Sequence, residues 1–435
     1  MAGGKTQHKF SVIISGGKQS TVLDNIDIHF VRLFEDIYSY CKTIHIVTRD
    51  TKALHEMLPI VGNEKVEIVY ASLLGDAGYD EKHFTFNIIK MNVNSHTDKN
   101  RHAIEIFGVD SNYKKLHSWK HTRSYSDACY TYMDITRHIL EVIAEIPIGK
   151  FENCEEKIKY FYNGLKTPIQ CAKWLSSRCK STATASPGYV FYSNTEVPGE
   201  DLFNVISIET LLQQGPSMPP VDSLYTVKSH NEYHINNIIS YHINRPDKQN
   251  MRKLFGAYSL CWDIKRKKYI KVDLSYDEAL TYVTCLGSKS LFAAHADDNE
   301  IDIYKPHINV NEDDEEILKN IYYGDWILRY CLQQTIQCSI EGHSQRYAGG
   351  MIEVKWPSAD DYIQTDENMT GLYLVKSITH QWMPKHTPNY VQKMVLIKNG
   401  YHSSDPALVD AVRVNDKKVE MRNVTSGLPL PVFPH

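Results

Sequence analysis

Short segments in which hydrophobic and polar residues alternate follow one another between residues 9 and 110, and this alternation is the pattern of half-buried β-strands. The segments are KFSVII, TIHIVTR, NEKVEIVYAS, KHFTFNIIKMNV and RHAIEIFGVD, and turns rich in Gly, Asn and Asp separate them. Such a series is typical of a small β-barrel or sandwich. Within it, the stretch VRLFEDIYSY, residues 31–40, predicts a short helix.

A helical period replaces the alternation after residue 113. In residues 124–147, apolar side chains recur at spacings of three and four, with Ser126 as a candidate N-cap and Pro147 as a stop. The strand-like segments SPGYVFYSN and FNVISIETLL follow further along the chain. Residues 113–212 are therefore predicted to form a mixed helical and β domain.

The segment KTPIQCAKWLSSRC contains the clearest helix start of the chain. Thr167 lies three residues before Gln170, so each side chain can accept a hydrogen bond from the backbone N–H of the other, which is a capping box. Pro168 occupies the first helical position, where a missing N–H leaves no hydrogen bond unmade. We therefore predict a helix that begins at Pro168.

Polar strands return beyond QQGPSMPPVD, a linker by its Gly and Pro content. The stretch YHINNIISYHI predicts one strand, and GAYSLCWDIKRKKYIKVDLSYDEAL predicts a two-stranded ribbon. Residues 317–340 have a helical period and follow the acidic run NEDDEE. Because acidic residues are stabilised at a helix N-terminus, this charge run needs no binding partner to explain it.

Three segments near the C-terminus repeat three early segments in the same order. NEKVEIVYAS resembles GGMIEVKWPS, HFTFNIIKMNV resembles LYLVKSITHQW, and RHAIEIFGVD resembles YVQKMVLIKNG. The offsets are nearly constant: 286 from Ile68 to Val354, 289 from Phe84 to Tyr373, and 290 from Ile106 to Leu396. Since chance rarely preserves both order and spacing, we interpret the ribbon of residues 370–400 as part of a second copy of the N-terminal β-region.

Size and composition limit the function classes. A chain of 435 residues needs more than one core, since single cores stop growing near ~250–300 residues. The formal net charge of −4 and the interleaving of charged residues disfavour stable nucleic-acid binding. Nine dispersed cysteines favour reduced, buried thiols of a cytosolic protein. We see no signal peptide and no apolar run of the ~18 residues that a membrane span needs, so we expect no membrane insertion.

Catalytic signatures are missing from the sequence. No nucleophile elbow, zinc-protease motif or dinucleotide-binding glycine fingerprint occurs, and two glycine-lysine stretches near the N-terminus lack the spacing of a phosphate-binding loop. The pairs His117/His121 and His230/His234 have metal-ligand spacing but no third carboxylate ligand, and we interpret them as surface histidines. We therefore expect no metal, no cofactor and no enzyme, although a carboxylate pair for sugar hydrolysis stays open.

The last ten residues, SGLPLPVFPH, are too rich in proline to fold on themselves. Two interpretations stand side by side: a disordered end, or an extended arm that binds a partner protein. The candidate partner-binding residues of such an arm are its apolar side chains, Leu428, Leu430, Val432 and Phe433.

Three further stretches together resemble the baseplate hub subunit of contractile-tailed bacteriophages of the T-even type, which are myoviruses. The first is YFYNGLKTPIQCAKWLSSRCKSTATASPGYVFYSN, the second is GAYSLCWDIKRKKYIKVDLSYDEA, and the third runs from RYCLQQTIQCSIEG through GGMIEVKWPS to MVLIKNG. The likeness covers most of the chain from about residue 129 to residue 400, and none of these motifs is catalytic.

The resemblance implies an α+β, β-rich fold with two similar small tail-tube-like β-barrel domains, and a mixed helical/β domain and a β insertion between them. We expect the first barrel in residues 1–112, the hub domain in 113–212, a β-ribbon insertion that partly completes the second barrel in 213–304, the second barrel in 305–400, and a C-terminal extended arm in 401–435.

The same resemblance implies a structural virion protein. Its homotrimer would form a pseudo-sixfold ring, because three chains with two equivalent barrels present six similar surfaces. The implied partners are the chain itself, a central spike protein, the tail tube protein and other baseplate (wedge) proteins. DNA would pass through the lumen without stable binding. The implied location is the tail baseplate of the virion, after assembly in the host cytoplasm.

Two other functions remain open on the sequence. A hub of a contractile secretion system would share the barrels, but a fused spike should show a periodic β-helix after residue 400, which we do not see. A phage-tail cell-wall hydrolase or glycan-binding module would need a cleft with paired carboxylates. A cellular, non-viral structural protein is a third and weaker interpretation.

Overall fold

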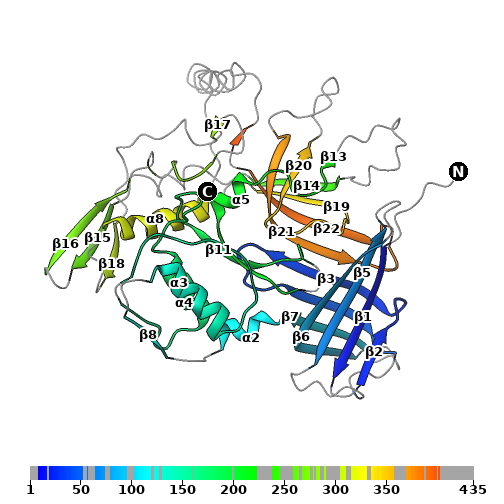
Figure 1. The fold of residues 1–435 in the computed structure, drawn as a ribbon. Coiled ribbons are helices and arrows are strands. Elements are labelled where there is room, and N and C mark those ends of the chain that lie inside the picture. The colour runs from blue at the N-terminus through cyan, green and yellow to red at the C-terminus, as the bar shows by residue number, and fades with distance from the viewer. Residues whose placement is uncertain are drawn as a thin grey trace, which may run out of the picture.

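The computed structural model is shown in Figure 1. It describes residues 8–16, 19–51, 56, 64–73, 79–95, 102–118, 122–126, 130–158, 160–197, 200–222, 238–244, 258–263, 267–274, 278, 281–284, 289–290, 304–309, 315–330, 335–356, 369–386, 388–398 and 400–401. Among these residues, no helix combines the length and the apolar character needed to cross a membrane.

The largest element is a sheet of 13 strands, which is antiparallel except where β13 pairs with β20 (Figure 1). Its main path is β14-β19-β22-β21-β3-β4-β7-β6-β5-β1-β2, and β20 and β13 branch from β21. The strands are β1 (His8–Gly16), β2 (Gln19–Leu23), β3 (Ile28–Asp36), β4 (Thr43–Arg49), β5 (Lys65–Leu73), β6 (Tyr79–Ser95), β7 (His102–Val109), β13 (Val221–Asp222), β14 (Ile238–Asn244), β19 (Thr335–Glu341), β20 (Met351–Lys355), β21 (Gly371–Trp382) and β22 (Tyr390–Ile397).

Strands β1 to β7 form what we call the N-module, drawn in blue in Figure 1. Every second residue of β4 is buried, and the same holds for β3 from Val31 onward. Residues such as Val31, Leu33 and Ile46 therefore join one hydrophobic core. The prediction of a helix over residues 31–40 is wrong, because residues 31–36 continue β3.

Strands β13, β14 and β19 to β22 form the C-module. Five of its strands, in the order β14-β19-β22-β21-β20, repeat the order β3-β4-β7-β6-β5 of the N-module. Every pairing within either set of five is antiparallel. The two sets therefore have the same topology, although the connections between their strands differ in length.

Two β-bulges align the modules residue by residue. His29 is the extra residue of β3 opposite β4, and Ile239 is the extra residue of β14 opposite β19. Each extra residue lies between the residues that pair with the fifth and the sixth residue of the partner strand. Ile89 and Lys376 are the extra residues of β6 and β21, each two pairs from the end of β7 or β22. Such bulges bend and twist a strand, so both modules curve at the same places.

The aligned bulges give residue offsets for each strand pair. The offset is 239 − 29 = 210 for β3 and β14, and 376 − 89 = 287 for β6 and β21. The register then gives 286 for β5 and β20 and 288 for β7 and β22. The offset of 286 agrees with the sequence comparison, whereas the offsets of 289 and 290 were each two residues too large.

A mixed helical and β region, most of which lies at the lower left in Figure 1, has its own hydrophobic core. It contains α2 (Asn112–His117), α3 (Tyr132–Arg137), the π-helix η2 (His138–Ile143), α4 (Pro168–Ser176) and α5 (Ile208–Gln213). Its strands are β8 (Ser124–Tyr125), β9 (Ile148–Phe151), β10 (Phe161–Tyr162), β11 (Tyr189–Ser193) and β12 (Phe203–Ser207).

The helix starts of this region follow local chemistry. The capping box predicted at Thr167 is confirmed: its backbone N–H donates to Gln170 Oε1 at 3.0 Å, and the Gln170 N–H donates to Thr167 Oγ1 at 3.4 Å. The N-cap of α3 is Thr131 rather than the predicted Ser126, because Thr131 and Asp134 form a second capping box. The segment FNVISIETLL is a strand only to Ser207, whose side chain caps α5.

The remaining described elements are α8 (Glu315–Tyr330), β15 (Tyr258–Asp263), β16 (Lys268–Asp273), β17 (Lys289–Ser290), β18 (Tyr304–Asn309) and β23 (Gly400–Tyr401). Helix α8 packs on the core of the C-module, and β15, β16 and β18 lie on the far side of α8 in Figure 1. The predicted ribbon is confirmed, since β15 and β16 are antiparallel partners. The predicted helix over residues 317–340 is correct only to Tyr330. Residues 335–341 form β19, in which Ile336, Cys338 and Ile340 are buried at a period of two.

Candidate functional site

The contact between the two modules is a direct strand pairing (Figure 1). Along one edge, β21 pairs with β22. Along its other edge, residues 371–374 pair with β20 of the C-module, and residues 377–382 pair with β3 of the N-module. The change of partner occurs at the bulge residue Lys376, whose ammonium lies 3.2 Å from Asp36 Oδ2. One strand therefore joins both modules into a continuous sheet.

A fully buried carboxylate, Glu35, lies at this junction. Its Oε1 is 3.2 Å from Nε2 of His380, which is also fully buried. Its Oε2 accepts backbone N–H hydrogen bonds from Thr195 at 3.2 Å and from Ala348 at 3.1 Å. Glu35 therefore connects β3 with β21, with the segment after β11 and with the turn before β20.

The proton arrangement around His380 follows from its neighbours. His380 Nδ1 lies 2.7 Å from the Tyr390 hydroxyl and 3.1 Å from Gln392 Nε2, both of which can donate to it. With Nδ1 as acceptor, the proton is on Nε2 and is donated to Glu35. Burial alone would raise the pKa of Glu35, but the hydrogen bond from His380, together with the donors from Thr195 and Ala348, holds that pKa below its ordinary value.

Aromatic rings from both modules fill the space beside this network. Trp382 stacks on Tyr390 with ring centroids 4.9 Å apart and on Phe10 of β1 at 5.7 Å. Tyr70 of β5 contacts Trp382 at 5.1 Å. Trp382 and Tyr390 belong to the hydrophobic core of the N-module although they come from the C-module. A Cβ at Gly342 would lie 2.1 Å from the Tyr390 ring, so only glycine fits there.

The sheet face opposite the core is half-buried and crosses the junction. A hollow of about 550 Å³ on this face is lined by residues of both modules, including Arg32, Phe107, Thr379, Gln381 and Lys393. Arg32 donates to Gln381 Oε1 at 3.2 Å across the junction. The two modules therefore present one shared surface on this side.

The helical region is attached to the N-module by buried polar groups. The Lys42 ammonium, which is inaccessible to solvent, lies 2.8 Å from Asp201 Oδ1 and 3.3 Å from the Asn194 carbonyl. Lys82 donates to the carbonyl of Thr195 at 3.3 Å. Burial raises the pKa of Asp110, although the nearby Lys42 charge opposes the shift. These contacts fix the helical region against the module junction.

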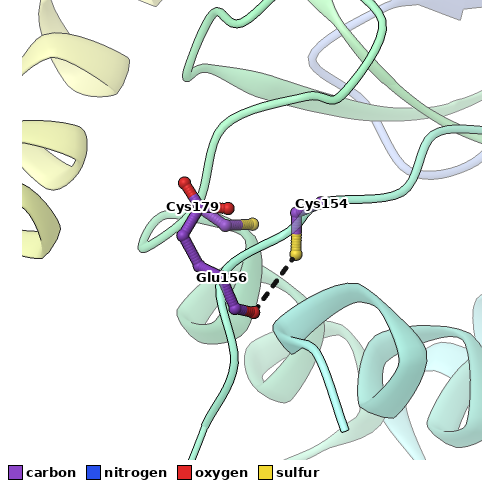
Figure 2. Close-up of side chains that lie close together, drawn as sticks. All are labelled: Cys154, Glu156 and Cys179. Carbon is purple, nitrogen blue, oxygen red and sulfur yellow. Dashed lines mark hydrogen bonds between the residues drawn. The ribbon is translucent and has the colours of Figure 1, made fainter.

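Two cysteines and a glutamate gather in the helical region (Figure 2). The ligand atoms of Cys154, Glu156 and Cys179 lie within 4.8 Å of one another. However, the Cys154 thiol donates to the Glu156 carbonyl at 3.7 Å, and Glu156 Oε1 accepts from the Lys180 N–H at 3.0 Å. A closed zinc site needs four ligands, and this cluster offers three among the described residues. We interpret it as hydrogen-bonded core packing.

The residues singled out from the sequence lie partly outside and partly inside the described part of the chain. The arm residues Leu428, Leu430, Val432 and Phe433 lie outside the described residues, as do His121, His230 and His234. Among the tryptophans of the described residues, Trp326, Trp356 and Trp382 are buried and Trp174 is partly buried. The cysteines found free among the described residues are all buried, as expected: Cys41, Cys154, Cys171, Cys179 and Cys338.

Sequence reasoning missed the junction. Glu35 and His380 are 345 residues apart in the chain, so no local pattern connects them. The available signal was a glutamate at an inward-facing position of an alternating segment. Because Glu35 and His380 are fully buried, they have no access to a substrate, and their arrangement serves to join segments rather than to catalyse a reaction.

No protein-family model matches the chain, and no curated protein sequence matches it. Among solved structures, the 43 kDa tail protein of prophage MuSo2 from Shewanella oneidensis is similar, with a TM-score of 0.53 and 11% identity over 89% of this chain and 98% of that chain. A tail protein from Neisseria meningitidis gives a TM-score of 0.52 and 11% identity over 90% and 98%.

The chain thus shares its fold with these two tail proteins, and it is β-rich and built around a large antiparallel sheet. A component of the E. coli type VI secretion system aligns over 92% of this chain and 79% of that chain, at 10% identity. Its TM-score of 0.45 is too low to add to the fold assignment.

Proposed function

We propose that the chain is the central hub subunit of a contractile-tail baseplate, and that three copies form a pseudo-sixfold ring. The observation that carries the proposal is the repeat itself. Two sets of five strands share their order and both bulges, and they are joined edge to edge within one chain by β3 and β21. The likeness to tail proteins supports the same function.

The repeat explains why such a chain suits an adaptor. A sixfold tube and a threefold spike have mismatched symmetries, and a ring of three chains with two similar modules each can contact both. In this proposal each module is a small tube-like barrel, and residues 1–112 and 305–400 are the two barrel domains. Part of residues 213–304 completes the second barrel, because β14 pairs with β19.

The proposal includes the partners. Residues 113–212, the helical hub domain, face the central spike protein, while the barrels contact the tail tube protein and other baseplate proteins. The C-terminal arm, 401–435, supplies an apolar partner-binding segment. DNA passes through the lumen without stable binding, in keeping with the net charge of −4. The protein is structural, not an enzyme, and resides in the virion tail after assembly in the host cytoplasm.

Mass measurement of the purified full chain tests the proposal. Three chains of 50.1 kDa give 3 × 50.1, or about 150 kDa, and light scattering over a range of concentrations should report this mass. Electron-microscopy class averages should show a ring with six similar lobes. A strict monomer at the highest concentration, both alone and with the spike protein, would refute the proposal. Hydrolysis of peptidoglycan by the chain would instead support the hydrolase.

A further inference from the structure

Several strand edges lack a partner among the described strands, and two of them correspond to strands of the internal junction. Residues 90–95 of β6 pair with β7 on one side, and on the other side the pairing with β5 stops at Asn87. At one end of the sheet path, β14 pairs with β19 only. Both edges therefore present backbone N–H and C=O groups that can accept another strand.

The internal junction shows what fits each edge. The alignment by bulges places residues 377–382 of β21 on residues 90–95 of β6, by subtraction of 287. It also places residues 31–34 of β3 on residues 241–244 of β14, by addition of 210. Since β21 and β3 pair with each other inside the chain, the two partnerless edges are the counterparts of two strands that already bind one another.

Side chains at the two partnerless edges are more exposed to solvent than their counterparts at the internal junction. Val31 and His380 are fully buried at the internal junction, whereas their counterparts Tyr241 and Val93 are 47% and 40% exposed. The bulge residues next to the two edges, Ile239 and Ile89, are each 54% exposed. Tyr241 and Val93 thus lie exposed at positions whose counterparts the internal junction covers.

Neither edge carries the usual protection against strand addition. Soluble proteins place charged residues or proline on edge strands to prevent pairing with another chain. The strand IISYHIN of β14 contains no Lys, Arg, Asp, Glu or Pro, and after Lys90 the β6 edge, MNVNS, contains none either. Both edges are therefore suited to bind a strand rather than to repel one.

We propose that β14 of one subunit pairs with residues 92–95 of β6 in the next subunit, in the antiparallel register of the internal junction. The register transferred from β3 and β21 sets Tyr241 opposite Ser95, His242 opposite Asn94, and residues 243 and 244 opposite residues 93 and 92. This inference rests on the proposed ring and specifies its interface.

A second copy of the chain is the occupant because the two edges are different and belong to different modules of one sheet. The β14 edge of one subunit would bind the β6 edge of the next, so the contact is head-to-tail. Head-to-tail contacts close into rings when the rotation between subunits permits. If every junction repeats the internal geometry, three chains supply three internal and three intersubunit junctions. Six junctions of one kind give the ring its sixfold character.

Paired cysteines test the register. The variant Asn94→Cys/His242→Cys places thiols at directly opposed positions, where Cα atoms in antiparallel strands lie about 4.5–5.5 Å apart, within reach of a disulfide. The control Asn94→Cys/Ser240→Cys is two residues out of register, which adds about 7 Å along the strand and prevents bridging. Arg32→Cys/Gln381→Cys, the internal counterpart, should form an intrachain disulfide.

After mild oxidation of the trimer, we expect denaturing gels without reductant to show covalent dimers and trimers for the in-register variant. The out-of-register and unsubstituted chains should remain monomeric on the gel. The variant with the internal cysteine pair should also run as a monomer, because its disulfide lies within one chain. A trimer by light scattering without in-register cross-links would overturn the proposed pairing and leave the hub function standing. A monomer would overturn both.

A charge substitution gives an independent readout. Val93→Asp changes an exposed side chain, so the isolated subunit should fold with an unchanged circular dichroism spectrum. Its association should weaken by roughly tenfold or more, because the carboxylate would lose water at the interface without gaining a partner. Ile26→Asp, at a residue 74% exposed in the turn after β2, is the matched control and should associate normally. Equal association of the two variants would contradict the proposed interface.

Discussion

Replacing Glu35 with alanine should destabilise the whole sheet, because this one carboxylate satisfies donors from three other segments. The change removes the acceptors of His380 Nε2, of the Thr195 N–H and of the Ala348 N–H. All three donors lie in the buried junction, where an unmade hydrogen bond costs about 1–3 kcal/mol. Because Glu35 is charged, its hydrogen bonds are of the stronger kind, worth about 1.5–3 kcal/mol each.

We therefore expect Glu35→Ala to lower the free energy of unfolding by about 3–5 kcal/mol, somewhat less than three separate losses because the cavity can admit water. Glu35→Gln should cost less, since its amide oxygen still accepts from the backbone donors. Urea unfolding at equilibrium, followed by tryptophan fluorescence, measures both. Glu67→Gln is the control, because Glu67 forms an exposed pair with His83 that should contribute at most about 1 kcal/mol.

A loss below about 1 kcal/mol for Glu35→Ala would refute the assignment of Glu35 as the link between the segments.

The dependence of stability on pH provides a second check on Glu35. The pKa of Glu35 is lower in the folded chain than its ordinary value of 4.5, so its contribution is complete above that pH and is lost as the pH falls through the folded pKa. The advantage of the unsubstituted chain over Glu35→Gln should therefore shrink below pH 4.5, and a constant difference would contradict the lowered pKa.

Three further predictions address other parts of the chain. Gly342→Ala should lower the unfolding midpoint, at a cost of about 1–3 kcal/mol, because its Cβ would enter the Tyr390 ring; an unchanged midpoint would show that the ring can move aside. Thr167→Ala should cost about 1 kcal/mol by removing the capping acceptor of the Gln170 N–H, and no change in thermal melting would argue against the cap. A thiol reagent should label Cys179 only as fast as the chain unfolds, since the thiol is buried and burial raises its pKa well above normal; rapid labelling in native buffer would contradict that burial.

Local signals predicted local structure well. The start of α4 followed from Thr167, Pro168 and Gln170 because all the groups that stabilise it lie within four residues. The error in β3 has the opposite cause. Glu35 occupies an inward position, so the stretch VRLFEDIYSY loses the alternation that marks a strand, and the partner that permits this burial, His380, lies far along the chain.

The repeat was visible in the sequence, but its register was not. A shift of two residues keeps every side chain on the same face of a strand, so an apolar pattern fits either alignment. For β6 and β7 the alignment to β21 and β22 was displaced by this amount. The bulges at Ile89 and Lys376 resolve the ambiguity, because they are features of hydrogen-bond pairing. For the same reason the junction could not be foreseen from the sequence.

Strand β21 pairs with strands of both modules, so the protein cannot be cut between the modules without breaking strand pairs. A fragment that ended before β21 would leave β3 with a bare edge and would empty the N-module core of Trp382 and Tyr390. The complementary fragment would expose those rings to water. We therefore expect neither half to reach its native state by itself, and the two modules to unfold in one cooperative transition.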